Sequence, residues 1–143
     1  MNRLLRLPQW TLTAVVTAAV LWLTLAPHPL PDEMDVPLFE DIDKVVHAIM
    51  MGGLAAAAAL DTMRRHKGGR NGARRWERLR PRACVIIIVA VSIFGGAIEL
   101  TQEAMGLGRG AEWGDLTADI VGAIIASLIF LKSPWPRSQQ TQG

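Results

Sequence analysis

Long apolar stretches alternate with shorter polar ones along this chain. Four predominantly apolar blocks occupy residues 10–26, 44–60, 83–105 and 115–131. With a rise of about 1.5 Å per residue, a helix over each block would cross most of a hydrocarbon core about 30 Å thick. The pattern therefore predicts an all-α protein, an integral membrane four-helix bundle that forms one domain over residues 1–132. Residues 133–143 are polar and are predicted to form a disordered cytoplasmic tail.

Small residues within these blocks predict that the helices approach one another closely. The second block contains Gly52, Gly53 and the alanines from 55 to 59. The third and fourth blocks each carry two small residues four positions apart, Ser92 with Gly96 and Gly122 with Ala126. Because the second block is only moderately apolar, we expect other helices, and not lipid, to surround it.

The first apolar block also has the features of a secretory signal peptide, since basic residues precede an apolar run. Arg3 and Arg6 are the basic residues here. However, Pro27 follows Ala26 directly, which is unfavourable for cleavage, and the run is longer than a usual signal core. We therefore expect a retained first helix, followed by a proline-rich acidic loop over residues 27–43.

The charged residues are sorted by segment, and this sorting predicts a topology. Thirteen of the fifteen Lys and Arg residues lie in the N-terminal tail, in the segment 61–82 and in the C-terminal tail, and the other two are Lys44 and Arg109. Loops rich in Lys and Arg stay on the cytoplasmic side of a membrane. Both termini are therefore predicted to be cytoplasmic. Eleven of the thirteen acidic residues then lie on or near the outer side.

The basic segment between the second and third blocks, Arg64–Arg82, allows two interpretations. Basic runs with an interleaved aromatic residue such as Trp76 can bind nucleic acid. In a loop between membrane helices, the same charges bind anionic lipid headgroups, each contributing up to about 1 kcal/mol. The second interpretation fits the neighbouring apolar blocks, so no nucleic-acid partner is predicted.

The single cysteine, Cys84, allows no disulfide framework or Cys-based zinc site and is expected to be a small buried apolar residue.

Polar residues interrupt three of the blocks at the end away from the basic segments. Each of three polar residues lies seventeen positions from a basic residue at the opposite end: His47 from Arg64, Glu99 from Arg82, and Asp115 from Lys132. In a helix this separation corresponds to about 25 Å. The three side chains are therefore predicted to lie at one depth, near the outer edge of the hydrocarbon. Asp119 is about 20 Å from the same basic end and so lies deeper.

Helical spacing predicts which way these side chains face. Asp43 and His47 are four residues apart, Glu99 is followed by Gln102 and Glu103, and Asp115 and Asp119 are again four apart. Residues three or four apart share a helix face. Because a charged side chain that faces lipid is strongly disfavoured, we expect these faces to turn toward one another and to line a pocket that opens outward.

Each of these residues also has a simpler explanation. Asp43 and Asp115 begin helices and could be N-caps. His47 could be a hydrogen-bonded histidine of the core. Glu99 and Asp119 are the hardest to explain in this way, because neither is a cap and both have apolar neighbours.

The motifs around these residues occur in a particular order along residues 40–130. They are Asp43-Lys44-x-x-His47, Glu99-Leu100-x-Gln102, Arg109 in the next loop, and Asp115-x-x-x-Asp119-x-x-Gly122-Ala123. Together they resemble the VanZ-like family of small bacterial membrane proteins. The resemblance implies a multi-pass protein of the bacterial inner membrane that is linked to the cell envelope, since the founding member is associated with low-level resistance to the glycopeptide teicoplanin. It implies no particular reaction, and many members have Asn where this chain has Asp119.

Three functions are consistent with these residues. In the first, the outward pocket binds, or acts on, a polar lipid or a cell-wall component. The catalytic candidates are then His47, Glu99 and Asp119, as general acid and base. The ligand-binding candidates are Asp43, Lys44, Gln102, Arg109 and Asp115. The sequence names no cofactor and leaves open whether any bond is broken.

The other two functions involve no covalent chemistry. The same His, Asp and Glu side chains could bind a divalent cation such as zinc or manganese, although their spacing matches no closed zinc motif and assigns no metal ligands. Alternatively, the polar groups satisfy one another and hold the helices together. Familiar soluble-enzyme classes are excluded, since the sequence has no phosphate-binding glycine loop, no Ser-His-Asp arrangement and no Cys-His pair.

Overall fold

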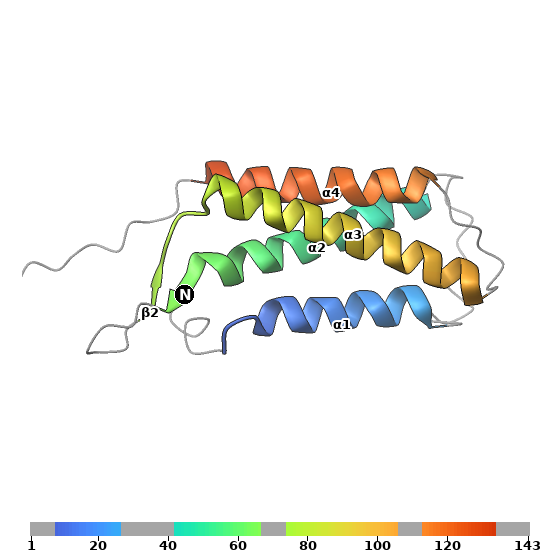
Figure 1. Cartoon of the computed structure of the whole chain (residues 1–143), viewed down its shortest axis with the longest axis horizontal. Helices are drawn as coiled ribbons and strands as arrows, with labels where there is room; N and C mark the ends of the chain where they lie inside the picture. Colours follow the sequence, from blue (N-terminus) through green and yellow to red (C-terminus); the bar gives the residue numbers. More distant parts are fainter. Residues whose placement is uncertain (1–7, 27–41, 67–73, 106–112, 134–143) are drawn as a thin grey trace, which may run out of the picture.

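The fold of this protein, seen in a computed structural model, consists mainly of four helices. The structure describes residues 8–26, 42–66, 74–105 and 113–133. The helices are α1 (Thr11–Leu25), α2 (Ile42–Met63), α3 (Pro81–Met105) and α4 (Trp113–Lys132). They run side by side, and consecutive helices point in opposite directions (Figure 1). The predicted all-α class is confirmed. The predicted acidic loop lies outside the described residues, except for its last two residues, which begin α2. The predicted tail after Ser133 also lies outside them.

Three of the four helices, α2, α3 and α4, are long and apolar enough to cross a membrane, with 22, 25 and 20 residues. The first helix is also apolar, but its 15 residues make it shorter than the others. At most 39% of any of the three candidate spans is buried inside the protein. Their outward faces carry large apolar side chains, among them Ile49, Ile86, Ile93 and Ile129. Such faces are suited to contact with lipid chains.

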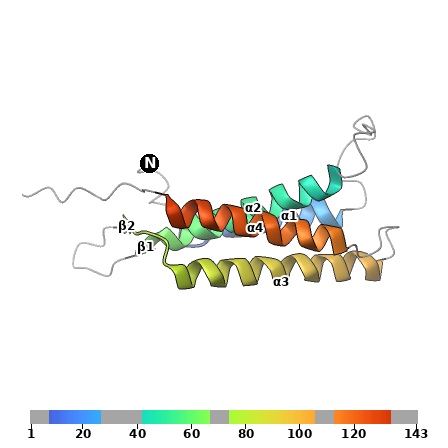
Figure 2. The same ribbon diagram turned by 90° about the horizontal axis from the view of Figure 1, so that it is seen from above.

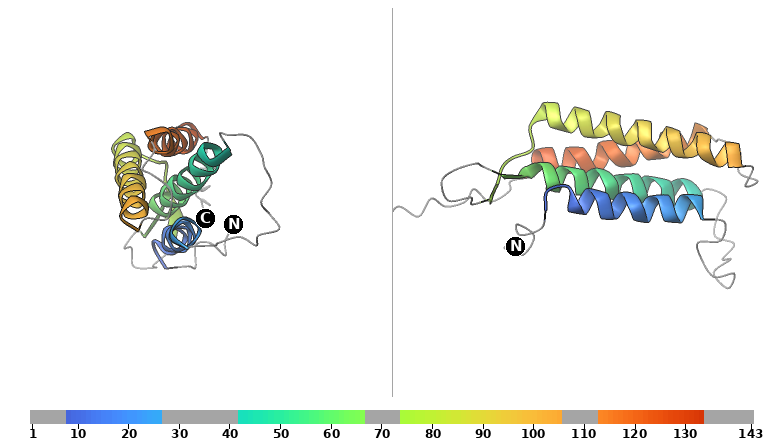
Figure 3. Two further views of the ribbon diagram at one scale, coloured as in Figure 1. Left: turned by 90° about the vertical axis from the view of Figure 1, so that its right-hand side faces the viewer. Right: turned by 60° about the horizontal axis from the view of Figure 1, so that its bottom comes forward.

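The second helix packs against all three of the others and makes the largest contact of the fold, with α4. It is tilted relative to α1 and α4 in Figure 1, and the end-on view in Figure 3 shows the same tilt. Ala55 and Ala59 on α2 are fully buried. The prediction that other helices surround this segment is therefore confirmed on these positions.

Glycine allows α2 and α4 to approach each other closely. A methyl group on Gly122 would overlap the backbone carbonyl oxygen of Ala48, and one on Gly52 would lie 3.2 Å from the carbonyl oxygen of Gly122. In Figure 2, α4 lies over α2 while α3 runs to one side. The close approach predicted from the small residues is confirmed for Gly52 and Gly122. Gly53 is different, since it is exposed and has no neighbouring atom within 4 Å of an added methyl group.

The segment predicted to be a basic loop contains a short antiparallel ribbon. Strand β1 (Arg64–His66) pairs with β2 (Arg74–Trp76), with Arg64 opposite Trp76. Helix α2 continues to Met63, beyond the predicted end at residue 60, so Asp61 is part of the helix. The described part of the basic segment is therefore more ordered than a loop.

One arginine of this segment is buried, which corrects a prediction. Arg64 is only 1% exposed, and its Nη2 group donates hydrogen bonds to Oδ1 of Asp61 and to the carbonyl oxygen of Pro8, the latter at 2.9 Å. The second oxygen of Asp61 accepts hydrogen bonds from the backbone N–H and the hydroxyl group of Thr13, at 2.9 and 2.8 Å. The prediction that Arg64 faces lipid headgroups is therefore wrong. Its charge is compensated inside the protein by a carboxylate three residues earlier.

Candidate functional site

Three predicted polar side chains, one each from α2, α3 and α4, meet inside the protein. Nδ1 of His47 lies 3.1 Å from Oδ1 of Asp119 and 3.7 Å from Oε1 of Glu99. One ligand atom from each residue lies within 4.8 Å of the other two. The side chains are 3%, 1% and 6% exposed for His47, Asp119 and Glu99. We call this group the polar centre. The predicted convergence is confirmed, while the catalytic role of the three residues stays a prediction.

The hydrogen bond between His47 and Asp119 orients the imidazole ring. A carboxylate oxygen can only accept, so the 3.1 Å contact is made by an N–H at Nδ1 when Asp119 is ionised. The 3.7 Å distance to Glu99 is longer than a hydrogen bond. Glu99 therefore lies beside the ring, where a small displacement would bring it into direct contact.

A glycine on α3 gives Asp119 the space it occupies. A methyl group on Gly95 would overlap Oδ2 of Asp119 and would lie 3.1 Å from its Cγ atom. That second carboxylate oxygen is buried and has no hydrogen-bond partner among the described residues. The absence of a side chain at residue 95 thus places a carboxylate between α3 and α4. Burying such a group in a membrane helix is costly unless it has a compensating interaction.

A second group of acidic residues shares the same histidine. Asp43 and Asp115 each offer a carboxylate oxygen that, with a ring nitrogen of His47, forms a set within 4.8 Å. Asp43 is exposed, whereas Asp115 is only 7% exposed. Both lie inside the first turn of their helices and not at the cap position, so the simple N-cap explanation is wrong. A carboxylate in a first turn is still favoured by the helix dipole.

The remaining predicted ligand-binding residues are placed differently. Lys44 is half-buried and passes over the start of α4, since a methyl group on Gly114 would lie 2.6 Å from its Cε atom. Gln102 is buried, but its Nε2 group donates a hydrogen bond of 2.9 Å to the carbonyl oxygen of Thr24. It therefore links α3 to α1 and is not part of the polar centre. Arg109 lies outside the described residues.

A groove of about 620 Å³ lies between α3 and α4, beside the polar centre. Most of its lining is apolar and includes Ile93, Leu100 and Leu116, and two carboxylates, Glu99 and Glu103, also line it. Ile93 and Leu100 are more than 60% exposed, so the groove is open at the surface of the helices. Glu99 belongs to both the groove and the polar centre. It therefore connects the surface with the buried His47.

The cluster of Asp61, Arg64 and Thr13 at the opposite end was missed by the sequence reasoning. Its signal was available, because Asp61 and Arg64 are three residues apart and so share a face if α2 continues past residue 60. Both side chains are buried and bonded to each other. The arrangement ties the start of α1 to the end of α2, so we interpret it as structural.

The length and composition of the helices define the class of protein. Three helices of membrane-spanning length and composition make this a membrane protein. No family model, no curated protein and no solved structure matches the chain. The resemblance to the VanZ-like family therefore depends on the motifs of the sequence alone.

Proposed function

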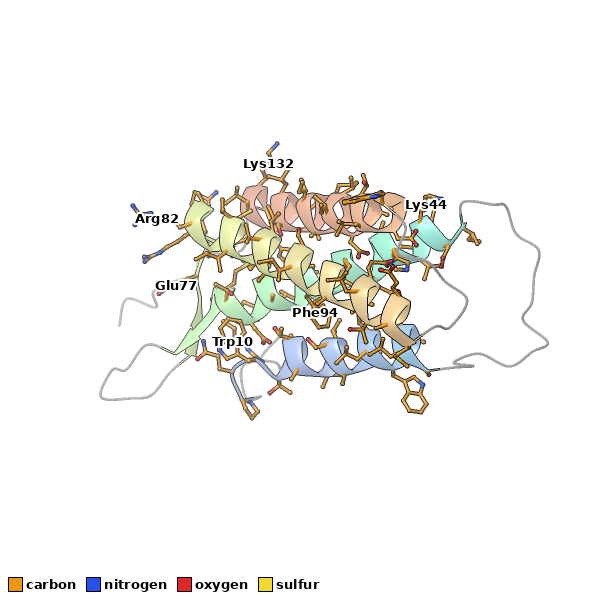
Figure 4. All side chains as sticks on the ribbon, turned by 45° about the vertical axis from the view of Figure 1, so that its right-hand side comes forward. Trp10, Lys44, Glu77, Arg82, Phe94 and Lys132 are labelled. Atoms are coloured by element: carbon orange, nitrogen blue, oxygen red, sulfur yellow. The ribbon has the colours of Figure 1, made fainter. Side chains whose placement is uncertain are left out.

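We propose that this chain is a multi-pass protein of the bacterial inner membrane, with its four helices in a bundle and both termini in the cytoplasm. The distribution of charge supports this orientation. Arg82 and Lys132 lie at one end of the helices and Lys44 at the other (Figure 4). Buried Asp115 and Glu99 lie toward the Lys44 end of their helices, which is the end poor in Lys and Arg and therefore the outer end by the positive-inside rule.

We further propose that the polar centre binds, or acts on, the polar part of a lipid or of a lipid-linked cell-wall component. The observation that carries this proposal is that Glu99 lines the apolar groove and also lies 3.7 Å from His47. A molecule with an apolar chain could lie against Ile93 and Leu100, with its polar part at Glu99. Sites for small molecules commonly combine an apolar lining with a few polar groups in this way.

The chemistry of the centre favours a ligand that carries hydroxyl or ammonium groups. Glu99 and Glu103 are both acceptors when ionised, so they would receive hydrogen bonds from such groups. Glu99 beside an oriented His47 also has the elements of a general acid–base pair. The half-buried Lys44 could interact with a phosphate of the same ligand.

The resemblance to the VanZ-like family supports the same proposal from a different direction. The motif residues that carry it include His47, Glu99 and Asp119, which are the three members of the polar centre. A role in the cell envelope, similar to glycopeptide resistance, would follow from that resemblance.

The proposal can be tested in a bacterium that lacks its own copy of this gene. Wild-type protein and the variants Glu99→Gln and His47→Ala would be produced. Glu77→Gln is a matched control, because this carboxylate lies near Arg82, at the opposite end of the helices from the centre (Figure 4). Teicoplanin susceptibility gives the envelope readout, and mass spectrometry identifies lipids that stay bound after purification. Wild type and control should retain a bound lipid and the envelope phenotype, and the two centre variants should lose both.

Protein abundance in the membrane separates this function from a purely structural role. If Glu99 and His47 only hold the helices together, the variants would reduce abundance or stability. If they bind a ligand, abundance stays at the wild-type level while phenotype and lipid are lost. Full activity in both variants would contradict the proposed function.

A further inference from the structure

We infer that His47, Glu99 and Asp119 form a binding site for a divalent transition-metal ion, zinc or manganese. The inference rests on the proposed function, because the ion would occupy the centre at which the envelope ligand is proposed to bind. Imidazole and carboxylate groups are suitable ligands for both metals. No closed zinc motif is present in the sequence, since the three residues come from three different helices.

The two distances from His47 to the carboxylates fit a single ion, and all three ligand atoms lie within 4.8 Å of one another. Two ligand atoms of a tetrahedral zinc ion are about 3.3 Å apart when the bonds are about 2.0–2.1 Å. The distances from His47 Nδ1 to Asp119 and Glu99 are 3.1 and 3.7 Å, on either side of that value. The Glu99 distance is too long for a hydrogen bond, but a shift of a few tenths of an ångström would place its oxygen on an ion. The N–H proton at Nδ1 would leave when the ion binds.

The carboxylate of Asp119 supplies an independent observation. It is 1% exposed, it is directed at His47 through Oδ1, and its Oδ2 has no hydrogen-bond partner among the residues that the structure describes. A buried carboxylate oxygen without a donor is costly. A divalent cation beside the carboxylate would compensate its charge, so the ion would relieve this cost.

The shared histidine makes two metal sites conceivable, and burial favours one. Asp43 and Asp115 form the alternative set with His47, but Asp43 is exposed. All members of the set formed by His47, Glu99 and Asp119, which we call the inner set, are buried. Their burial excludes competing water and strengthens electrostatic attraction. Asp43 and Asp115, which with His47 form the outer set, are better suited to accept a hydrogen bond from the second ring nitrogen of His47. Outer-shell carboxylates commonly do this around zinc-bound histidines.

The inner set also lies beside the groove and would leave one coordination position of the ion free. Glu99 lines the groove, so an ion or a ligand can reach the centre from the surface of α3 and α4. Three protein ligands around a four-coordinate ion leave one position for water or for a ligand oxygen. The metal would act there as a Lewis acid toward that oxygen.

The test uses the full-length protein purified in lipid nanodiscs. The protein is stripped with a chelator, loaded separately with Zn²⁺ and Mn²⁺, and dialysed, and the bound metal is measured by elemental mass spectrometry. We expect one ion per chain in the wild type. In Asp119→Asn, which keeps the shape of the side chain, and in His47→Asn, which removes the imidazole ring, the affinity should fall by more than about 100-fold, exceeding the usual loss from outer-shell changes. Glu77→Gln, at the opposite end of the helices from the centre, should bind normally.

Replacement of the metal by Co²⁺ adds a readout that does not depend on activity. The visible absorption of bound Co²⁺ should appear in wild type and in Glu77→Gln and should disappear in Asp119→Asn. Absence of a stoichiometric ion in the wild type with either metal overturns the inference. So does a result in which Asp115→Asn abolishes binding and Asp119→Asn does not, because the ion would then occupy the outer set.

These experiments test the metal-site inference and the proposed function separately. If the wild type binds no metal but Glu99→Gln still loses the bound lipid and the envelope phenotype, the metal inference fails and the function stands. If Glu99→Gln loses the metal but keeps lipid and phenotype, the function fails and the metal site stands.

Discussion

The space that Gly95 leaves for Asp119 gives a prediction that can be worked out from the structure. A methyl group at residue 95 would overlap Oδ2 of Asp119 and would lie 3.1 Å from Cγ and 3.2 Å from Cβ of the same residue. Rotation of the carboxylate could move its oxygen but not its Cβ atom. Because carbon atoms pack best at about 3.5–4.0 Å, α3 and α4 must separate by about 0.3–0.9 Å in Gly95→Ala.

The separation of the two helices should cost more stability than the replacement of glycine by alanine gains within the helix. Overpacking a well-packed interior typically costs about 1–3 kcal/mol. Without the clash, Gly→Ala within a helix stabilises by about 0.5–1 kcal/mol. The neighbouring Gly96 is the matched control, since a methyl group there meets only Leu116 Cδ1, at an ordinary distance of 3.8 Å. Both variants share this helix gain, so their free energies of unfolding should differ by the overpacking cost alone, about 1–3 kcal/mol.

Unfolding by titration with SDS in detergent micelles, followed by circular dichroism, measures these free energies. A double-mutant cycle identifies the cause of the effect. In an Asp119→Gly background, the Oδ2, Cγ and Cβ atoms that the methyl group would meet are all absent. The penalty of Gly95→Ala should then fall well below its value in the wild-type background.

Two results would refute this reasoning. One is that Gly95→Ala is as stable as Gly96→Ala, which would mean that the two helices adjust without cost. The other is an equal penalty with and without the Asp119 carboxylate, which would place the clash elsewhere on α4.

Three further predictions concern the buried ion pair, the contact between α1 and α3, and the orientation. Asp61→Asn should destabilise the protein by about 3–5 kcal/mol in the same unfolding assay, because it leaves a buried arginine without its carboxylate; a loss below about 1 kcal/mol, as for an exposed pair, would contradict this. Gln102→Leu should cost about 0.5–1.5 kcal/mol through loss of its hydrogen bond to α1, and an unchanged stability would show that the bond contributes nothing. In a Cys84→Ala background, Trp113→Cys should react with an impermeant maleimide added to intact cells, and Arg80→Cys should react only after the cells are opened. Both native side chains are exposed, so the reverse labelling would contradict the proposed orientation.

The helices could be predicted from the sequence because each apolar block is long and bounded by polar residues. The prediction was less accurate in the basic segment. There, helix α2 continues to Met63 and Arg64 is buried. An arginine in a charged run is normally solvated, so only its contact with Asp61 and with the carbonyl oxygen of Pro8, just before α1, reveals its burial. That contact depends on how α1 packs against α2, which no local pattern contains.

The polar centre could be predicted in part for a geometric reason. Counting residues along helices gives depth, so His47 and Glu99 were expected near one level. Direction around the helix axis is less certain. Gln102 is three residues after Glu99 and therefore about 60° away around the axis, since an α-helix has 3.6 residues per turn. This rotation is enough for Gln102 to contact Thr24 on α1 while Glu99 lies beside His47.

The packing of α4 explains why the polar centre lies where it does. Asp119 and Gly122 are three residues apart on α4 and so lie on one face of the helix. Gly122 brings the backbone of α2 close at Ala48, the residue after His47, and Asp119 accepts a hydrogen bond from the His47 ring. The close backbone approach therefore positions the imidazole within reach of the carboxylate. Because the same approach buries both groups, the centre combines an oriented histidine with a carboxylate whose charge needs a partner, as a ligand-binding site would require and a simple helix contact would not.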